Sequence, residues 1–383
     1  MYLFNSWFAF LALLAAKVII GIHILAGFFS PQLTYVEPPA SPPAPVATTS
    51  QTTAAPSTTP QEAPAVRTAT PLPAVTSSST PAAALTPSAP PPTPLTADQI
   101  EQINQQTRAA LVNILCTTKA GGSFAPISGS GVFIDNRGII LTNAHVAQFF
   151  LLRDYLVPGN IDCVIRIGSP AQAAYTAELL YLPPAWITAN AAQILSSHST
   201  GTGENDYAFL RVTGTTNSAG SMPASFPAMP MALAEPDIGA QVLLAAYPAA
   251  YFGGATIQMN LYSSSAITGI KELYSFSGTQ QVDLVSLGDT VVTQSGSSGG
   301  AVVNLDRDSL IGLISTESAG TTTSSRTLYG ITLSYINRGL AGAGKGGIAA
   351  LLLKNPEQEA KDFATNVAPS ETQALETVLN KTR

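Results

Sequence analysis

The pattern of hydrophobic and polar positions divides the chain into an apolar start, a polar low-complexity stretch and a long region of short strands. Residues 3–29 are apolar with few interruptions. The interruption with the highest free-energy cost in a membrane is the charged side chain of Lys17, near the middle of the run. The run is long enough to cross a bilayer as a helix, and no small-residue cleavage motif closes it. We therefore predict a membrane anchor in residues 1–36, with a cleaved signal peptide as the alternative. Either segment would send the rest of the chain out of the cytoplasm.

The stretch 37–97 consists almost entirely of Pro, Ala, Thr and Ser, and it contains no aromatic residue. Such a composition cannot bury enough apolar surface to offset the entropy lost when the chain is ordered. We predict a disordered linker here, which acts as a spacer between the first segment and the region that follows.

From residue 98 the pattern changes to a short amphipathic helix, followed by many short strands with glycine-rich turns. A helical insertion is predicted over 185–196, and the pattern itself suggests no function for it. After the strands, the apolar positions of 339–383 recur with helical spacing. The pattern therefore predicts a β-rich domain over 98–338 and a helical C-terminal tail over 339–383.

The composition limits the classes of function. Hydrophobic residues make up 45% of the 383 positions, which is enough for a sizeable core, and charged residues make up only 10%. The net charge of -6 gives no basic patch, so we expect no nucleic-acid partner.

Residues 339–345 nearly match a phosphate-binding loop, but Gly346 stands where a hydroxyl would bind magnesium. A flexible hinge is predicted there instead of a nucleotide site.

The stretch Gln294–Gly300 has the composition of a sharp turn that presents a nucleophile. Two glycines directly follow Ser298, and Gly296 precedes it by two positions. In such a turn the Ser298 hydroxyl projects outward, and the backbone N–H groups of Gly296 and Ser298 can converge on one point. Ser298 is therefore the candidate nucleophile, and these two N–H groups are the candidate oxyanion hole.

A serine hydroxyl is a weak nucleophile until a base takes its proton. Of the three histidines in the chain, His23 lies in the apolar start and His198 in Ser/Thr-rich sequence, whereas His145 directly follows a strand-like run. The carboxylate best placed to orient His145 is Asp206, which opens another strand. The catalytic candidates thus occur in the order His145, Asp206, Ser298. No histidine follows Ser298, so the order found in α/β-hydrolases is excluded.

Three motifs in this order resemble those of trypsin-like serine proteases. They are Thr142-Asn143-Ala144-His145-Val146, Asn205-Asp206-Tyr207-Ala208 and Gly296-Ser297-Ser298-Gly299-Gly300. The strand patterns over 129–134 and 239–248 are similar to those of the bacterial HtrA/DegS-type enzymes, although no PDZ-like repeat of strands follows the protease motifs. The resemblance implies an all-β fold of two six-stranded antiparallel β-barrels of the chymotrypsin type, joined around 213–230.

The resemblance also implies a reaction and a pocket. The reaction is hydrolysis of polypeptides through an acyl-enzyme, with no metal or cofactor. In this family the base of the primary pocket is set largely by the residue six positions before the nucleophile, here Val292, and the facing segments include Ser315, Thr316 and Thr332. None of these residues is charged, so a small or medium apolar residue is expected before the cut. The one nearby acid, Glu317, could redirect that preference.

The two cysteines, Cys116 and Cys163, lie in strands that are neighbours in the first barrel of this family. The resemblance therefore places the two thiols within bridging distance and implies a disulfide, with two buried free thiols as the alternative.

Together these observations predict an extracytoplasmic, membrane-tethered serine endopeptidase. The alternative from another class is a catalytically inactive protease-like domain that binds polypeptides as a tethered module.

Overall fold

The structure, a computed structural model, describes residues 94–381 except for 120–125, 196–201, 250–253, 277, 279 and 318–326. The predicted membrane segment and most of the predicted linker lie outside the described residues. Within the described part of the chain, no helix combines the length and the hydrophobicity needed to cross a membrane.

The described chain begins with the predicted amphipathic helix, α2 (Ala97–Ala110). Thr96 caps its N-terminus: the Thr96 hydroxyl accepts from the Gln99 N–H at 3.3 Å, and the Gln99 side chain accepts from the Thr96 N–H at 2.9 Å. This reciprocal pair satisfies backbone donors that the first helical turn leaves unpaired. Ile103 and Ala110 lie on the buried face of the helix, which leads directly into the first strand.

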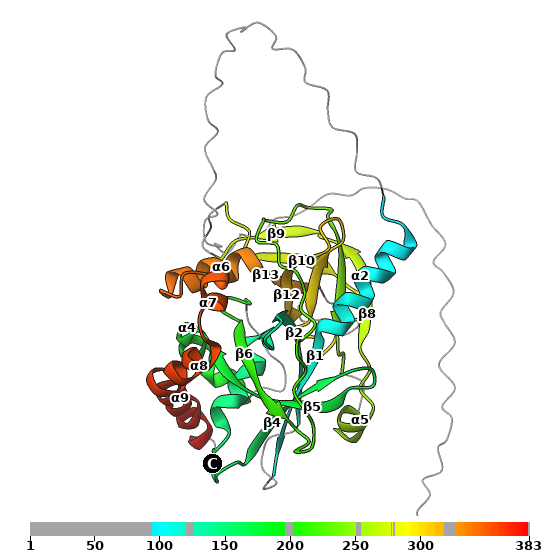
Figure 1. Ribbon diagram of the computed structural model, residues 1–383. Coiled ribbons are helices and arrows are strands. Elements are labelled where there is room, and N and C mark those ends of the chain that lie inside the picture. Colours follow the sequence, from blue (N-terminus) through cyan, green and yellow to red (C-terminus); the bar gives the residue numbers. More distant parts are fainter. Residues whose placement is uncertain are drawn as a thin grey trace, which may run out of the picture. The chain divides into compact units, whose positions relative to one another are not determined.

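The first sheet is a closed, antiparallel six-stranded barrel in the order β1-β2-β3-β6-β5-β4 (Figure 1). Its strands are β1 (Leu111–Thr118), β2 (Ile127–Asp135), β3 (Ile139–Thr142), β4 (Ile161–Ile167), β5 (Gln172–Tyr181) and β6 (Ala208–Thr215). A hairpin turn joins β2 to β3, and Gly138 in that turn has a φ of 86°, a conformation that favours glycine. Helix α3 (Ala144–Ala147) and the 3-10 helix η1 (Gln148–Leu152) follow β3.

The second sheet has seven strands in the order β8-β7-β11-β12-β13-β10-β9. They are β7 (Gln241–Ala246), β8 (Ser264–Gly269), β9 (Glu272–Tyr274), β10 (Leu284–Gly288), β11 (Ala301–Asn304), β12 (Ser309–Glu317) and β13 (Leu328–Thr332). The two ends of this order, β8 and β9, are consecutive in the chain, with only Ile270 and Lys271 between them. The Ile270 N–H donates to Ala240 at 3.0 Å, and the Lys271 N–H donates to Ser286 at 2.8 Å.

Ile270 is thus paired with the residue directly before β7, and Lys271 is paired with a residue of β10. Because the hydrogen bonding continues through the two linking residues, β8 and β9 act as two halves of one bent strand. Counted in this way, the second sheet curls round into six strands. The two curled antiparallel sheets form the double barrel of the chymotrypsin type, as predicted. The difference from the prediction is local: the bend at Ile270 and Lys271 divides one expected strand into two.

The cores of the two barrels share strand β7. Val242, Leu244 and Ala246 belong to the cluster inside the second barrel, whereas Leu243 and Ala245 belong to the large cluster that also fills the first barrel. Alternate side chains of a strand point to opposite faces, so one strand serves both clusters. The barrels are therefore packed against each other through a continuous apolar contact.

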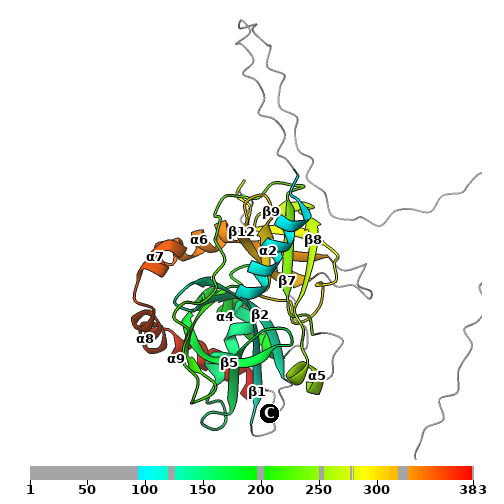
Figure 2. The ribbon, with the colours of Figure 1, turned by 45° about the vertical axis from the view of Figure 1, so that its right-hand side comes forward.

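The predicted helical C-terminus is present as α6 (Leu333–Gly342), α7 (Ile348–Leu353), α8 (Pro356–Asn366) and α9 (Ala368–Asn380). Helix α6 runs across the predicted boundary at 338. The segment predicted as a hinge instead ends α6, where the Lys345 N–H donates to Leu340 at 2.9 Å. Figure 2 shows the four helices along one flank of the molecule.

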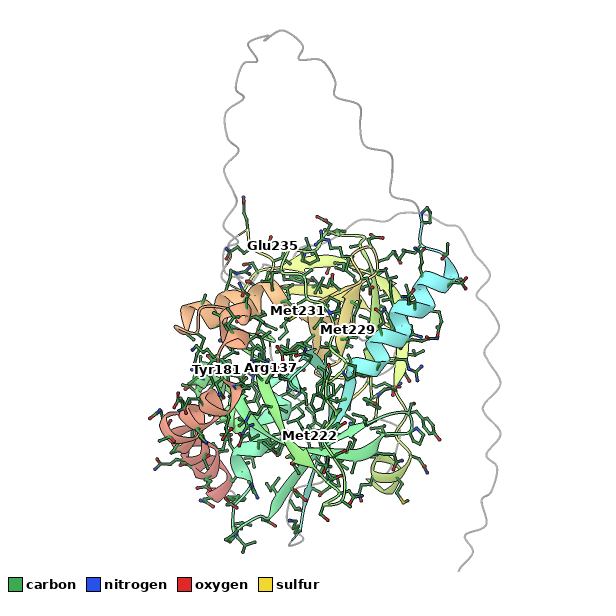
Figure 3. All side chains as sticks on the ribbon, in the orientation of Figure 1. Arg137, Tyr181, Met222, Met229, Met231 and Glu235 are labelled. Carbon is green, nitrogen blue, oxygen red and sulfur yellow. A yellow bond between two sulfur atoms is a disulfide. The ribbon has the colours of Figure 1, made fainter. Side chains whose placement is uncertain are left out.

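Helices α7 and α8 are anchored to the first barrel. Figure 3 shows Arg137 and Tyr181 on the side of the barrel that these helices cover. The Arg137 guanidinium donates to the backbone carbonyl of Leu352 at the end of α7. The Tyr181 ring lies 6.5 Å from the ring of Phe363 in α8. Helix α9 then packs against η1 and against the helical insertion α4 (Pro184–Asn190) and η2 (Ala191–Leu195).

Candidate active site

His145 lies at the start of α3, directly after β3, and faces Asp206 at the start of β6. The Asp206 carboxylate accepts two hydrogen bonds from this one residue: from the His145 backbone N–H to Oδ1 at 2.9 Å, and from Nδ1 to Oδ2 at 2.8 Å. The side chain of Asp206 is 4% exposed and that of His145 is 13% exposed. A buried carboxylate at Nδ1 places the proton on that nitrogen and leaves Nε2 free to act as a base.

Asp206 is held from several directions. The Asn143 side-chain amide donates to the Asp206 backbone carbonyl at 2.8 Å. The Ser315 hydroxyl, from β12 in the second barrel, donates to Asp206 Oδ2 at 2.9 Å. Four donors from three residues therefore fix both the backbone and the carboxylate of Asp206.

The residue before Asp206 is also fixed from the second barrel. Asn205 has a φ of 58°, in the left-handed region that a non-glycine residue seldom adopts. The Tyr335 hydroxyl of α6 accepts from the Asn205 N–H at 2.9 Å and lies 3.3 Å from the Asn205 side-chain oxygen. Tyr335 thus stabilises the turn from which the Asp206 carboxylate projects.

Ser298 lies in the turn before β11, with its hydroxyl half-buried. The hydroxyl donates to the backbone carbonyl of Ser315 at 3.2 Å, and the Ser298 carbonyl accepts from the Ser130 N–H at 2.8 Å. Ser315 therefore contacts both candidates: its side chain reaches Asp206 and its carbonyl reaches Ser298. Asp206 thus contacts His145 directly and is linked to Ser298 through Ser315.

In the turn that carries Ser298, the N–H groups on either side of Ser297 have no acceptor among the described residues. The Ser297 N–H donates to Gln294 at 3.1 Å, and the Gly299 N–H donates to Ile314 at 2.8 Å. Within the described part of the chain, the N–H groups of Gly296 and Ser298 have no hydrogen-bond partner. A pair of unpaired donors in a rigid turn is suited to stabilise a developing oxyanion.

Ser130 of β2 connects this turn to the first barrel. Its hydroxyl donates to the Gly296 carbonyl at 2.7 Å and accepts from the Tyr247 N–H at 2.9 Å. A Cβ on Gly299, which has a φ of 84°, would lie 2.0 Å from the Ser130 carbonyl oxygen. Glycine at 299 is therefore required because the backbones of the two barrels approach each other too closely for a side chain.

The residues predicted to form the primary pocket have other partners in the structure. Val292 is fully buried in the core cluster of the second barrel. The Thr332 hydroxyl donates to Val282 at 2.8 Å and accepts from the Tyr335 N–H at 3.1 Å, so it caps α6. Ser315 contacts Asp206, as described above, and the side chains of Thr316 and Glu317 lie outside the described residues. The pocket assignment thus stays a prediction.

The predicted disulfide is present. Cys116 in β1 and Cys163 in β4 occupy directly opposite positions on neighbouring antiparallel strands, and their sulfur atoms are bonded. Among the residues that the structure describes, no cluster of His, Cys, Asp and Glu side chains could hold a metal ion.

Sequence reasoning missed three residues of this site. Ser315 was placed in the substrate pocket, Tyr335 received no role, and Ser130 was noted only as part of a strand. Asn205 offered one usable signal, because asparagine is enriched in the left-handed conformation. The hydroxyl that stabilises it lies 130 positions away in the chain, and no local pattern points to it.

Residues 129–313 match the family described as the trypsin-like peptidase domain. No curated protein matches the chain. Among solved structures, the active form of the Rv3671c protease from M. tuberculosis is similar, with 19% sequence identity and a TM-score of 0.39. That match covers 68% of this chain and 93% of the other.

Proposed function

We propose that this chain, whose residues 129–313 match the trypsin-like peptidase domain, is a serine endopeptidase that hydrolyses polypeptides through an acyl-enzyme. The observation that carries the proposal is the double contact of the buried Asp206 carboxylate with the backbone and the ring of His145. Such a contact fixes both the tautomer and the orientation of the imidazole, which are the two properties that a general base at a serine needs.

In the proposed reaction Ser298 attacks the substrate carbonyl while His145 Nε2 accepts its proton. His145 later passes this proton to the leaving amine, and Asp206 stabilises the imidazolium. The N–H groups of Gly296 and Ser298 stabilise the tetrahedral oxyanion, an effect typically of about 3–4 kcal/mol per donor. No metal or cofactor takes part.

The Ser298 hydroxyl must turn before it can react. In the absence of substrate it donates to the Ser315 carbonyl at 3.2 Å, a neutral and fairly long hydrogen bond. In the proposed reaction the hydroxyl exchanges this acceptor for the free Nε2 of His145. Since a neutral hydrogen bond contributes only about 1 kcal/mol net, the exchange adds little to the barrier.

We further propose that the enzyme is HtrA-like and works outside the cytoplasm, tethered through residues 1–36 and a spacer over 37–97. The apolar run and the Pro/Thr-rich composition support the tether. The disulfide between Cys116 and Cys163 supports an oxidising compartment, because such bonds rarely persist in the cytosol. Fractionation of the full chain beside a variant that lacks residues 1–36 tests the tether: equal recovery of both as soluble protein would contradict it.

The second candidate function is an inactive protease-like domain that binds polypeptides. The observation that favours it is the direction of the Ser298 hydroxyl, which donates to Ser315 and not to His145. The two candidates differ in one property that can be measured. A working triad makes Ser298 reactive toward electrophiles, and an inactive domain does not.

Labelling with a fluorophosphonate probe tests the proposed enzyme. We expect the wild-type chain to be labelled, Ser298→Ala to be unlabelled, and Ser295→Ala to be labelled like the wild type. Ser295 is a matched control because it lies in the same turn with its side chain exposed. A folded wild-type chain that resists the probe would contradict the enzyme and support the binding module.

A further inference from the structure

A cavity of about 240 Å³ opens beside the catalytic candidates, on the side of the first barrel. Its lining includes His145, Trp186, Asn190, Gln193, Glu204 and Asp206. Most of one wall comes from the helical insertion α4 and η2, for which the catalytic proposal has no use. The cavity is separate from the predicted primary pocket, whose residues belong to the second barrel.

The wall formed by the insertion combines an aromatic side chain with two amides. Trp186 is 4% exposed and lines the cavity. The Gln193 side-chain N–H donates to the Asn190 side-chain oxygen at 2.7 Å, and the Asn190 amide donates to the Trp186 carbonyl at 3.0 Å. These bonds fix the two amides, while the Gln193 side-chain oxygen has no partner within the described residues.

The opposite wall adds a negative charge. Glu204 is exposed, and within the described part of the chain its carboxylate has no hydrogen bond and no ion pair. None of the lining residues that the structure describes is a lysine or arginine, and the Asp206 carboxylate is already occupied by His145 and Ser315. These described residues therefore offer one free carboxylate, a free amide oxygen and an aromatic side chain, and no lysine or arginine.

We propose that this cavity is a substrate subsite that takes the side chain of a lysine or arginine. A cation gains a charged acceptor from Glu204 and a neutral acceptor from Gln193, and its apolar stem can lie along the aromatic side chain of Trp186. An acidic side chain would be repelled by the Glu204 carboxylate. A purely apolar side chain would bury this carboxylate and the Gln193 amide oxygen without hydrogen-bond partners. The inference rests on the proposed function, because it places a substrate residue beside His145.

The C-terminal tail gives this subsite a fixed wall. Helix α9 packs against both α4 and η2, and its Leu375 and Leu379 are buried. A specificity pocket discriminates only when the groups that line it are held in place. The insertion and the tail, for which the sequence suggested no role, thus serve one purpose: the insertion forms the subsite and the tail supports it.

The test uses the full chain and a set of internally quenched peptides. Each peptide carries Lys or Arg at one position around the cleavage site, and its partner peptide carries Gln or Met at the same position. We expect kcat/KM to be about three- to tenfold higher for the basic peptide at one position other than the residue directly before the cut. Glu204→Gln should remove this preference, so that the ratio of kcat/KM for the basic peptide to kcat/KM for its neutral partner falls to about one.

Asp237→Asn is the matched control, because it removes one exposed negative charge far along the chain from the cavity. It should keep the preference, and high salt should weaken the preference in the wild type and in this control alike. Turnover without a basic preference, or a preference that survives in Glu204→Gln, overturns the subsite alone. No turnover of any peptide overturns the proposed function, and the subsite with it.

Discussion

The contact between Tyr335 and Asn205 can be tested by removing a single oxygen atom. Tyr335→Phe keeps the ring, which packs edge-on against Tyr207 at 6.4 Å and Phe276 at 5.0 Å, and deletes only the hydroxyl. The Asn205 N–H then loses its acceptor, while the backbone keeps its unfavourable left-handed conformation. The perturbation therefore acts on the turn that carries Asp206 and not on the packing of α6.

The expected magnitude follows from the two hydrogen bonds. A net hydrogen bond contributes about 1 kcal/mol, and a donor left unpaired in a partly buried place costs about 1–3 kcal/mol. We expect the free energy of unfolding to fall by about 1–3 kcal/mol. If half of that loss loosens the Asp206 turn in the transition state, kcat/KM falls by about three- to tenfold, since about 1.4 kcal/mol corresponds to a factor of ten.

The assay combines urea unfolding with peptide hydrolysis. A positioning role predicts a lower kcat with an unchanged KM, because Tyr335 acts through Asn205 on the turn that carries Asp206. Tyr262→Phe, at an exposed tyrosine, is the matched control and should change neither quantity. In the Tyr335→Phe background, Asn205→Gly should recover part of the lost stability, because glycine adopts the left-handed conformation without strain. Equal stability and equal kcat for Tyr335→Phe and Tyr262→Phe would refute the reasoning.

Three other predictions follow from single contacts. Gly299→Ala should fail to give soluble folded protein, because the added methyl group would lie 2.0 Å from the Ser130 carbonyl oxygen. A thermal unfolding curve like that of the wild type would contradict the close approach of the two barrels. Burial raises the pKa of the Glu371 carboxyl, so ionised Glu371 destabilises the fold as the pH rises above the ordinary value of 4.5. Glu371→Gln should therefore raise the melting temperature at pH 7 and leave it unchanged at pH 4, and the opposite pH dependence would be inconsistent with the burial. The paired change of Cys116 and Cys163 to serine should lower the free energy of unfolding by about 4 kcal/mol, as the chain-entropy relation gives for a loop closed over 47 positions, and calorimetry measures it.

Local patterns in the sequence were sufficient to predict the strands and helices and to select the catalytic candidates. Short apolar runs between glycine-rich turns predicted the strands, most of which are buried on both faces, and the resemblance to trypsin-like proteases implied their arrangement in two barrels. His145, Asp206 and Ser298 could be chosen because each stands directly beside such a strand, in an order that only one family shares. The helical tail could also be predicted from the sequence, because its apolar positions recur with helical spacing.

The tertiary structure alone decided which distant residues support these candidates. Ser315 lies 109 positions from Asp206, and Tyr335 lies 130 positions from Asn205. A hydroxyl can donate to any acceptor that folding brings within reach, so its sequence neighbours carry no information about its partner. The same reason explains why the contact of Ser315 with Asp206 could not be predicted, and why the insertion and α9 have a proposed role only through the packing of α9 against α4 and η2. Strand and turn preferences are local in the chain, whereas the contacts that orient a catalytic group are local only in space.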